Sequence, residues 1–259
     1  MTDSARFSWT VLLPVKVLAR AKSRLAALAG DRRGELALAL AADTAAAAIG
    51  CPEVARVIVI TSDPVAGPLL AGLGAVVVPD RPADRQASLG NHADRASTDT
   101  PADLRVPDLA ELSIQGLSIQ GLGVQDSLNA ALRHGAAVAA RRWPGTGLAA
   151  LTADLPALDP AELAAALRAS ASAPDRPAFV PDAAGVGTTL YAVPPGREFR
   201  PLFGGASRAR HAASGATELD FDPMTGLRRD VDTPDDLRTA LALGAGPRTR
   251  AAASLFTDV

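Results

Sequence analysis

Basic residues gather just after the first apolar run of the chain. Residues 11–25, VLLPVKVLARAKSRL, contain Lys16, Arg20, Lys22 and Arg24. Cations at the end of a buried strand can surround a triphosphate, because open α/β sheets bind ligands where their strands end. The alternative is a solvated basic loop, which charge alone favours. The position of this loop in the fold therefore decides between the two interpretations.

Two short motifs supply carboxylates that could hold a metal ion. Asp154 stands in LTADLPAL directly after an apolar run, and Asp230 and Asp232 alternate in RRDVDTPDDL, which we expect at a strand end. Carboxylate oxygens are hard ligands suited to Mg²⁺ that bridges phosphate oxygens. Each aspartate could instead cap a helix or close a turn, and Asp232 stays open between a metal ligand and a turn residue. Thr233 is expected to cap the helix that begins at Pro234.

Glycines and hydroxyl side chains form a third kind of site. Thr188 follows two glycines in AGVGTTLY (184–191), and Gly204 and Ser207 belong to FGGASRARHAASGA (203–216). Glycine lets backbone N–H groups approach an anion, and a helix beginning near Ser207 would add the positive end of its dipole. Together the motifs predict a second phosphate pocket, although each taken singly is more often a tight turn or an ordinary helix start. The cationic contacts that the second motif could add come from Arg208, Arg210 and His211.

Several common enzyme sites are missing from the sequence. It contains no GxxxxGK[ST] phosphate loop and no GxSxG nucleophile elbow, and none of its GxG triplets lies between a first strand and a first helix. His92, His134 and His211 have no metal-ligand spacing, and the single cysteine, Cys51, is expected to be a buried or incidental thiol. These observations argue against a P-loop enzyme, a dinucleotide-binding enzyme, a Ser-His-Asp hydrolase and a zinc protein.

Composition and charge narrow the class of protein further. The chain has 259 residues, 48% of them hydrophobic, and a net charge of −2, which argues against nucleic acid as a partner. One cysteine excludes an internal disulfide and fits a reducing cytoplasm. The N-terminal apolar run is broken by Pro14 and Lys16 and is far shorter than the ~20 residues of a membrane span. We therefore expect a cytoplasmic protein that binds no membrane.

The elements that must position these motifs alternate along the chain. Apolar runs without polar alternation predict strands buried on both faces, at residues 9–14, 56–61, 75–78, 147–152, 178–181 and 188–193. Alanine-rich stretches between them predict helices at residues 31–49, 127–142, 160–171, 207–213 and 234–243. This alternation is typical of an α/β fold with a mostly parallel sheet covered by helices.

One segment interrupts this pattern. Residues 79–125 mix Pro, Asp, Arg and Ser with little apolar periodicity, and LSIQG at 112–116 is repeated at 117–121, with a decayed third copy, LGVQD, at 122–126. Such a composition buries too little surface to offset the entropy of ordering, and a five-residue repeat favours duplication within a loop over a solenoid. The sequence thus predicts one domain over residues 1–259 that carries a disordered insertion.

The motifs VKVLARAKSRL, ADLPAL, VGTTL, FGGASRARHAASGA and DVDTPDDL occur in this order along most of the chain. In this combination the sequence resembles the phosphoenolpyruvate and 2-phospho-L-lactate guanylyltransferases of coenzyme F-420 (deazaflavin) biosynthesis. The resemblance implies a nucleotidyltransferase fold of the glycosyltransferase-A type, a three-layer α/β/α sandwich. It also implies Mg²⁺-dependent transfer of GMP from GTP to phosphoenolpyruvate, giving enolpyruvyl-diphospho-guanosine for a downstream transferase.

The resemblance assigns roles to the matching residues of this chain. Asp154 and Asp230 match metal-binding carboxylates and, with Lys22, form the implied catalytic set. The triphosphate of GTP is expected near Lys16, Lys22 and Arg24, and the phosphate of phosphoenolpyruvate near Thr188, Gly204 and Ser207.

Several alternatives stay open. The acceptor could be 2-phospho-L-lactate or 3-phospho-D-glycerate, and another nucleotidyltransferase of this fold, such as a molybdopterin guanylyltransferase, is the second interpretation. A regulator that binds nucleotide without turnover is disfavoured, since Asp154 and Asp230 are both present. Ser127 stands where a glycine is more familiar in the family. The sequence does not decide between a monomer and a homodimer.

Overall fold

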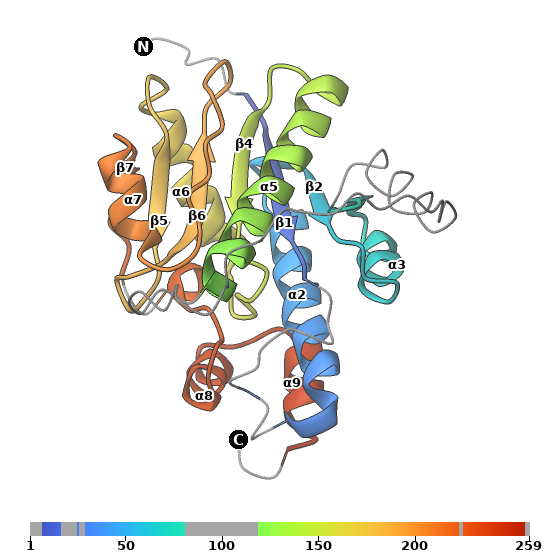
Figure 1. Cartoon of the computed structure of the whole chain (residues 1–259). Helices are drawn as coiled ribbons and strands as arrows, with labels where there is room; N and C mark the ends of the chain where they lie inside the picture. Colours follow the sequence, from blue (N-terminus) through green and yellow to red (C-terminus); the bar gives the residue numbers. More distant parts are fainter. Residues whose placement is uncertain (1–6, 17–24, 26–28, 81–118, 223–224, 257–259) are drawn as a thin grey trace, which may run out of the picture.

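The computed structural model of the chain describes residues 7–16, 25, 29–80, 119–222 and 225–256 (Figure 1). Within these residues the strands are β1 (Trp9–Pro14), β2 (Val54–Ile60), β3 (Val76–Val78), β4 (Gly147–Leu151), β5 (Ala178–Pro181), β6 (Thr188–Val193) and β7 (Thr217–Glu218). The helices are α2 (Arg33–Ile49), α3 (Ala66–Gly72), α5 (Ile119–Arg142), α6 (Pro160–Ala171), α7 (Ser207–Ala213), α8 (Pro234–Ala242) and α9 (Pro247–Ala253). Short 3-10 helices are η3 (Gly30–Arg32) and η5 (Gly226–Arg228).

The described strands form one sheet in the order β3-β2-β1-β4-β6-β5-β7. β1 runs parallel to β2 and β4, β2 runs parallel to β3, and β5 runs parallel to β7. β6 is antiparallel to both of its neighbours, β4 and β5. Because of this reversal, the beginning of β6 lies at the edge of the sheet where β1 and β4 end.

Helices cover the sheet on both faces. Val11 and Leu13 pack with α2 and α6 in one buried cluster, whereas Leu12 packs with α5 in another. Alternate residues of a strand point to opposite faces of the sheet, and residues 9–13 of β1 are all buried. Both faces of β1 are therefore covered, and its run WTVLL is apolar except for Thr10. Figure 1 shows α5 on one side of the sheet and α6 on the other. A third cluster joins α2 to α8 and α9 and includes Leu40 of α2, Leu237 of α8 and Ala253 of α9.

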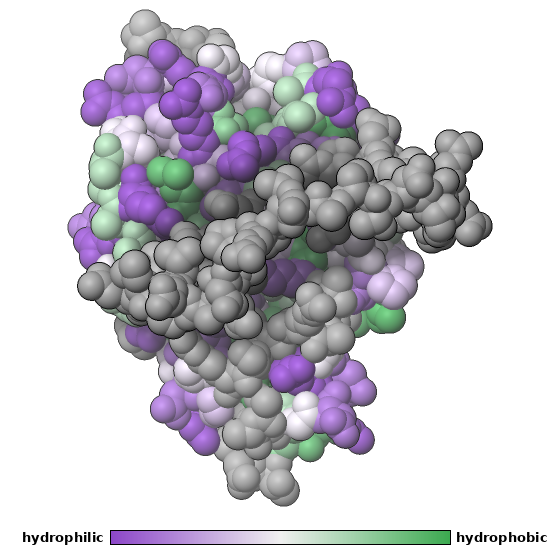
Figure 2. Space-filling model, in the orientation of Figure 1, coloured by the Kyte–Doolittle hydropathy of each residue, from purple (hydrophilic) through white to green (hydrophobic). Residues whose placement is uncertain are grey.

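Among the described residues, five large apolar side chains are exposed. Val65, Leu69 and Val77 lie around α3 and β3, and Val186 and Leu255 lie elsewhere on the surface. Figure 2 shows hydrophilic residues over much of the described surface on the visible face, with small separate hydrophobic patches between them. Within the described residues, no helix is both long enough and apolar enough to span a membrane.

The predicted α/β sandwich with a mostly parallel sheet is confirmed. The predicted bounds match the structure for β1, β5, β6, α6 and α7, and they differ by one or two residues at the ends of β2, β3, β4, α2 and α8. Thr233 caps α8 as predicted, since its hydroxyl accepts the backbone N–H of Asp236 and the Asp236 carboxylate accepts the N–H of Thr233. The structure adds α3, α9 and the two-residue β7, which the sequence pattern did not indicate.

Two predictions about local structure were wrong. Helix α5 begins at Ile119, not at residue 127, so the repeat copy LGVQD lies in a helix and not in a loop. The segment contains no proline, and extending a helix costs far less than nucleating one. The second error concerns Asp230, which follows the 3-10 helix η5 and not a strand. Most of the predicted insertion, residues 81–118, lies outside the described residues.

Candidate functional site

Three of the candidate residues lie at one edge of the sheet. Lys16 is exposed just after the end of β1, Asp154 follows the end of β4, and Thr188 begins β6. The backbone N–H of Thr152 donates to the carbonyl of Thr189 at 2.9 Å, which continues the β4–β6 pairing toward this edge. The topology thus places a cation, a carboxylate and a hydroxyl where an α/β sheet binds ligands.

A backbone hydrogen bond brings the second aspartate to the first. The N–H of Val231 donates to the carbonyl of Asp154 at 3.0 Å, so that Asp230 stands beside the loop that carries Asp154. Both aspartates are partly exposed. The two carboxylates come from segments 76 residues apart in sequence that meet at the same edge of the sheet.

The loop that carries Asp154 is fixed from helix α2. The buried hydroxyl of Thr44 accepts the N–H of Leu155 at 2.9 Å and donates to the carbonyl of Leu40 at 2.8 Å. A buried backbone N–H needs such a partner, because leaving it unsatisfied costs free energy. Thr44 therefore holds the backbone directly after Asp154.

The segment before Asp230 is fixed from helix α6. The Glu162 carboxylate accepts the N–H groups of Gly226 at 3.3 Å and Leu227 at 2.9 Å. A Cβ atom at Gly226 would lie 1.9 Å from the carbonyl oxygen of Ala157, so only glycine allows η5 to lie this close to the ADLPAL loop. The close packing brings the segment of Asp230 against the segment of Asp154.

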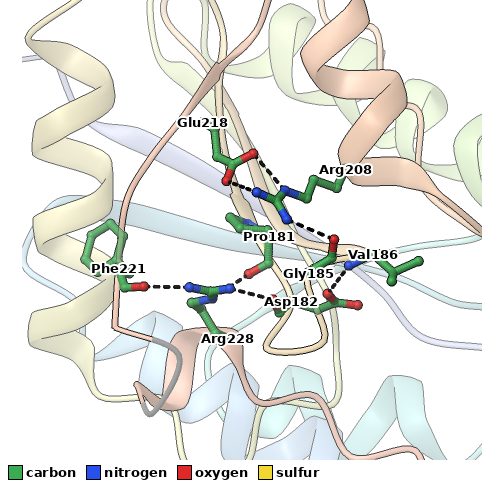
Figure 3. Close-up of polar contacts among 8 residues, drawn as sticks. All are labelled: Pro181, Asp182, Gly185, Val186, Arg208, Glu218, Phe221 and Arg228. Atoms are coloured by element: carbon green, nitrogen blue, oxygen red, sulfur yellow. Dashed lines mark hydrogen bonds and ion pairs between the residues drawn. The ribbon is translucent and has the colours of Figure 1, made fainter.

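Arg228 joins the Asp230 segment to the turn that precedes Thr188 (Figure 3). Its buried guanidinium donates to the carbonyls of Pro181 at 3.1 Å, Asp182 at 2.8 Å and Phe221 at 2.6 Å. The carbonyl of Arg228 in turn accepts the N–H of Ala183 at 2.8 Å. Arg228 therefore satisfies buried carbonyls and ties three chain segments together.

The glycine turn before Thr188 binds a carboxylate of its own chain. Asp182 accepts the N–H of Val186 and the N–H of Gly187, each at 2.8 Å. A Cβ atom at Gly187 would lie 2.4 Å from the Asp182 carboxylate, which explains the glycine. The N–H groups of Val186 and Gly187 are therefore already bound to Asp182 and do not point toward a substrate. The expectation that the glycines before Thr188 offer backbone N–H groups to a phosphate is corrected for Gly187.

Arg208 is engaged with the same hairpin. Its guanidinium pairs with both oxygens of the Glu218 carboxylate, at 2.9 and 2.8 Å, and also donates to the carbonyl of Gly185 at 3.1 Å (Figure 3). The neighbouring Glu218 carboxylate raises the pKa of Arg208. The expectation that Arg208 contacts a ligand is replaced by a structural role.

The FGGAS loop is held from two helices. The side chain of Asn129 on α5 accepts the N–H of Phe203 at 2.9 Å and donates to the Phe203 carbonyl at 3.1 Å. The guanidinium of Arg210 on α7 donates to the carbonyls of Phe203 and Gly204. Gly204 has a φ of +96°, which favours glycine at this position. Ser207 is buried at the start of α7.

His211 connects Thr188 to this loop. Its Nδ1 lies 3.0 Å from the hydroxyl of Thr188, and its Nε2 accepts the N–H of Leu202 at 3.0 Å. Burial, together with the neighbouring Arg210, lowers the pKa of His211 to about 4. The imidazole is therefore neutral at physiological pH, and the expectation of a cationic contact from His211 was wrong.

Two of the predicted site residues, Lys22 and Arg24, lie outside the described residues. The structure describes the others, which are Lys16, Asp154, Asp230, Thr188, Gly204 and Ser207. Cys51 is buried, and burial raises the pKa of its thiol, in keeping with the expected inert cysteine. In the described part of the chain, no group of three or more His, Cys, Asp and Glu side chains could hold a metal ion.

The sequence reasoning did not single out the side chains that hold these loops. Thr44 and Asn129 lie within predicted helices, and Arg228 is the first residue of RRDVDTPDDL, a motif chosen for its aspartates. Their only signal in the sequence is a polar side chain within an alanine- and leucine-rich helix, or a basic one before an acidic pair.

Comparison with curated proteins gives close relatives over nearly the full chain, whereas no protein-family model matches it. A protein named phosphoenolpyruvate guanylyltransferase from Thermomonospora curvata is 50% identical over 253 residues, which cover 98% of this chain and 92% of the relative. Proteins of the same name from Streptomyces coelicolor and Salinispora arenicola are 49% and 46% identical, covering 95% and 93% of this chain and 96% and 91% of the relatives.

Solved structures with a related chain path were also found. A nucleotidyl transferase from Methanothermobacter thermautotroptrophicus has a TM-score of 0.47 at 18% identity, covering 92% of this chain and 97% of that one. A CMP:2-keto-3-deoxy-manno-octonic acid synthetase in complex with CTP has a TM-score of 0.48 at 16% identity, covering 91% and 98%.

Proposed function

Because the chain belongs to the phosphoenolpyruvate guanylyltransferase family, we propose that it transfers GMP from GTP to phosphoenolpyruvate. The products are enolpyruvyl-diphospho-guanosine and pyrophosphate. The observation that carries this proposal is the 50% identity over 98% of the chain. Every relative named above carries phosphoenolpyruvate in its name, which does not favour 2-phospho-L-lactate, 3-phospho-D-glycerate or a molybdopterin as the acceptor.

The nucleotide side of the site rests on the basic loop. Lys16 stands exposed at the end of β1, and in our proposal it acts with Lys22 and Arg24 on the triphosphate of GTP. Two polyanions must approach each other in this reaction, so fixed cations next to the phosphates lower the electrostatic cost of bringing them together. The role of the basic loop is therefore charge compensation, with Lys22 as its catalytic member.

Asp154 and Asp230 fit a divalent cation. Both are partly exposed, both are carboxylates, and the Val231–Asp154 hydrogen bond places their segments side by side. A pair of hard oxygen ligands with remaining positions for phosphate oxygens and water is the donor set that Mg²⁺ takes in phosphoryl-transfer sites. When bound, Mg²⁺ would draw electron density from the α-phosphate of GTP. We propose that these two aspartates hold it.

The acceptor side of the site is formed by Thr188, Gly204 and Ser207. In our proposal their hydroxyl and backbone groups hold the phosphate of phosphoenolpyruvate. This assignment is supported by the links between their segments, since His211 contacts Thr188 and Arg210 donates to the carbonyl of Gly204. The buried position of Thr188 and Ser207 limits their motion, which favours a defined orientation of the bound phosphate.

The reaction itself needs no general base in this arrangement. A phosphate oxygen of phosphoenolpyruvate attacks the α-phosphorus of GTP, a new P–O bond forms, and the bond to the β-phosphate breaks to release pyrophosphate. The attacking oxygen is already anionic near neutral pH. The neutral, buried His211 is consistent with this scheme, because no proton has to be taken from the nucleophile.

Pyrophosphate release by the purified protein tests the proposal. The protein receives GTP and Mg²⁺ with phosphoenolpyruvate, 2-phospho-L-lactate or 3-phospho-D-glycerate in separate reactions, and mass spectrometry identifies the guanosine diphosphate diester. We expect turnover with phosphoenolpyruvate. A downstream transferase of coenzyme F-420 biosynthesis, which we propose consumes the product, is added to trap it if it is labile. If pyrophosphate is released with another acceptor but not with phosphoenolpyruvate, the assignment of the acceptor is overturned.

A further inference from the structure

The two hydrogen bonds of His211 determine which of its nitrogens carries the proton. The backbone N–H of Leu202 can only donate, and it points to Nε2 at 3.0 Å, so Nε2 carries a lone pair. A neutral imidazole has one N–H group, which must then be on Nδ1. Nδ1–H therefore donates to the hydroxyl oxygen of Thr188, 3.0 Å away.

The surroundings of His211 hold it in this neutral form. The imidazole is fully buried and stacks on Tyr191, with 4.6 Å between ring centroids, and its ring also contacts Phe179 and Phe203. The nearby charged side chain is Arg210 on the same helix, which opposes a second positive charge. The direction of the His211–Thr188 hydrogen bond is therefore constant across the physiological pH range.

We propose that His211 is a positioning residue that sets the direction of the Thr188 hydroxyl, an inference that rests on the proposed function. Because Thr188 accepts from Nδ1–H, its own proton is available to be donated to an anionic oxygen of the acceptor phosphate. With the opposite tautomer, Thr188 would donate to the imidazole and would present only lone pairs to the phosphate. His211 thus contributes to recognition of the phospho-acid without touching it.

Two variants separate this role from simple packing. Asn in place of His211 keeps an N–H donor near the Nδ1 position and loses the acceptor for Leu202. Gln keeps an acceptor near the Nε2 position and loses the donor to Thr188. We expect His211→Gln to raise the KM for phosphoenolpyruvate about tenfold, while the KM for GTP stays unchanged. We expect His211→Asn to raise the KM for phosphoenolpyruvate less and also to leave the KM for GTP unchanged. Equal losses in the two variants, or a larger loss in His211→Asn, would overturn the proposal.

A double-mutant cycle with Thr188 checks the partner directly. Thr188→Val removes the hydroxyl at nearly constant volume, and Thr188→Ser keeps it. In the Thr188→Val background, His211→Gln should add nothing to the KM for phosphoenolpyruvate, whereas in the Thr188→Ser background it should still raise it. Additive effects in both backgrounds would mean that His211 does not act through Thr188.

Two controls keep the outcomes distinct. Thermal unfolding of each variant shows whether it is folded. If His211→Gln is not folded, His211→Leu, which also removes the donor to Thr188, supplies the cycle in the Thr188→Val and Thr188→Ser backgrounds, and we expect its loss only in the Thr188→Ser background. Wild-type turnover with phosphoenolpyruvate is measured first. Its absence would overturn the proposed function, while turnover with additive variant effects would overturn the role of His211 alone.

Discussion

Thr44, Asn129 and Arg228 hold backbone segments of the site through hydrogen bonds, while the side chains assigned to chemistry stand on those segments. The sequence predicts the second group because Asp154 and Thr188 belong to short motifs at the ends of apolar runs. It does not predict the first group, since hydrogen bonds such as those of Asn129 with Phe203, 74 positions apart, and Arg228 with Asp182, 46 positions apart, leave no local pattern. The hydrogen bonds of Asp182 with Val186 and Gly187 are local, but an aspartate a few residues before a glycine turn does not by itself indicate them.

The two carboxylates provide the most direct test at the scale of single residues. Asp154→Asn and Asp230→Asn should each lower Mg²⁺-dependent pyrophosphate release about 100-fold or more, because an amide oxygen is a weaker ligand than a carboxylate for a hard cation. Both side chains are partly exposed, so the thermal unfolding midpoint should change little. Asp235→Asn removes a charge from an exposed position on α8 and serves as the matched control. A wild-type rate in Asp154→Asn would remove that residue from the metal site.

At the scale of elements, the site depends on the way helices hold loops. α5 contributes Asn129 to the FGGAS loop, α6 contributes Glu162 to η5, and α2 contributes Thr44 to the ADLPAL loop. The helices themselves were predictable from alanine-rich periodicity, and α6 and α7 have the predicted bounds. The start of α5 was not predictable, because the LSIQG repeat is typical of a loop by composition and period.

Asn129→Ala tests the contact between α5 and the acceptor loop. The change removes the side-chain partner of the Phe203 N–H and leaves the Phe203 carbonyl with Arg210 alone, so we expect a loss of about 1–3 kcal/mol in the free energy of unfolding. The KM for phosphoenolpyruvate should rise more than the KM for GTP, because in our proposal this loop holds the acceptor phosphate. Arg133→Ala on the exposed face of the same helix is the control. Equal changes in both KM values would argue against a role confined to the acceptor loop.

Gly226→Ala tests the packing of η5 against the ADLPAL loop. The new methyl group would lie 1.9 Å from the carbonyl oxygen of Ala157, so one of the two aspartate segments has to move. Overpacking of this kind costs about 1–3 kcal/mol or more, and we expect urea unfolding to show it together with a fall in kcat. Gly72→Ala, in helix α3, meets no atom within 4 Å, so it should not destabilise the chain and should leave kcat unchanged. If Gly226→Ala lowers the stability but leaves kcat unaltered, the close packing of η5 is not needed to position the two aspartates.

At the scale of the whole molecule, the strand order was the part of the fold that the sequence pattern left undetermined. Apolar runs identify buried strands, but they do not identify neighbours, and β6 reverses direction between β4 and β5 through pairings such as Leu148 with Val193. This reversal is what brings the start of β6, and with it Thr188, to the edge where β1 and β4 end. The candidate site is therefore a property of the sheet as a whole.

The buried His211 also links the global stability of the protein to pH. Its pKa is about 4 in the folded chain against 6.5 for an ordinary histidine, so between these values the unfolded chain binds a proton that the folded chain does not. Stability is therefore complete above pH 6.5 and is lost as pH falls toward 4. Between pH 7.5 and 5.0 we expect His211 alone to account for a loss of about 2 kcal/mol.

Urea unfolding at the two pH values measures this loss. Carboxylates contribute to acid sensitivity in every variant, so the informative quantity is the difference between the wild type and His211→Asn, which has no titrating group at this position. We expect the pH dependence to be weaker in His211→Asn by about 2 kcal/mol, and His134→Asn, at a partly exposed position on α5, serves as the matched control. The same pH dependence in all three proteins would mean that His211 is protonated as readily in the folded as in the unfolded chain. Its Nε2 would then carry a proton that points at the N–H of Leu202, contrary to the hydrogen bond between them.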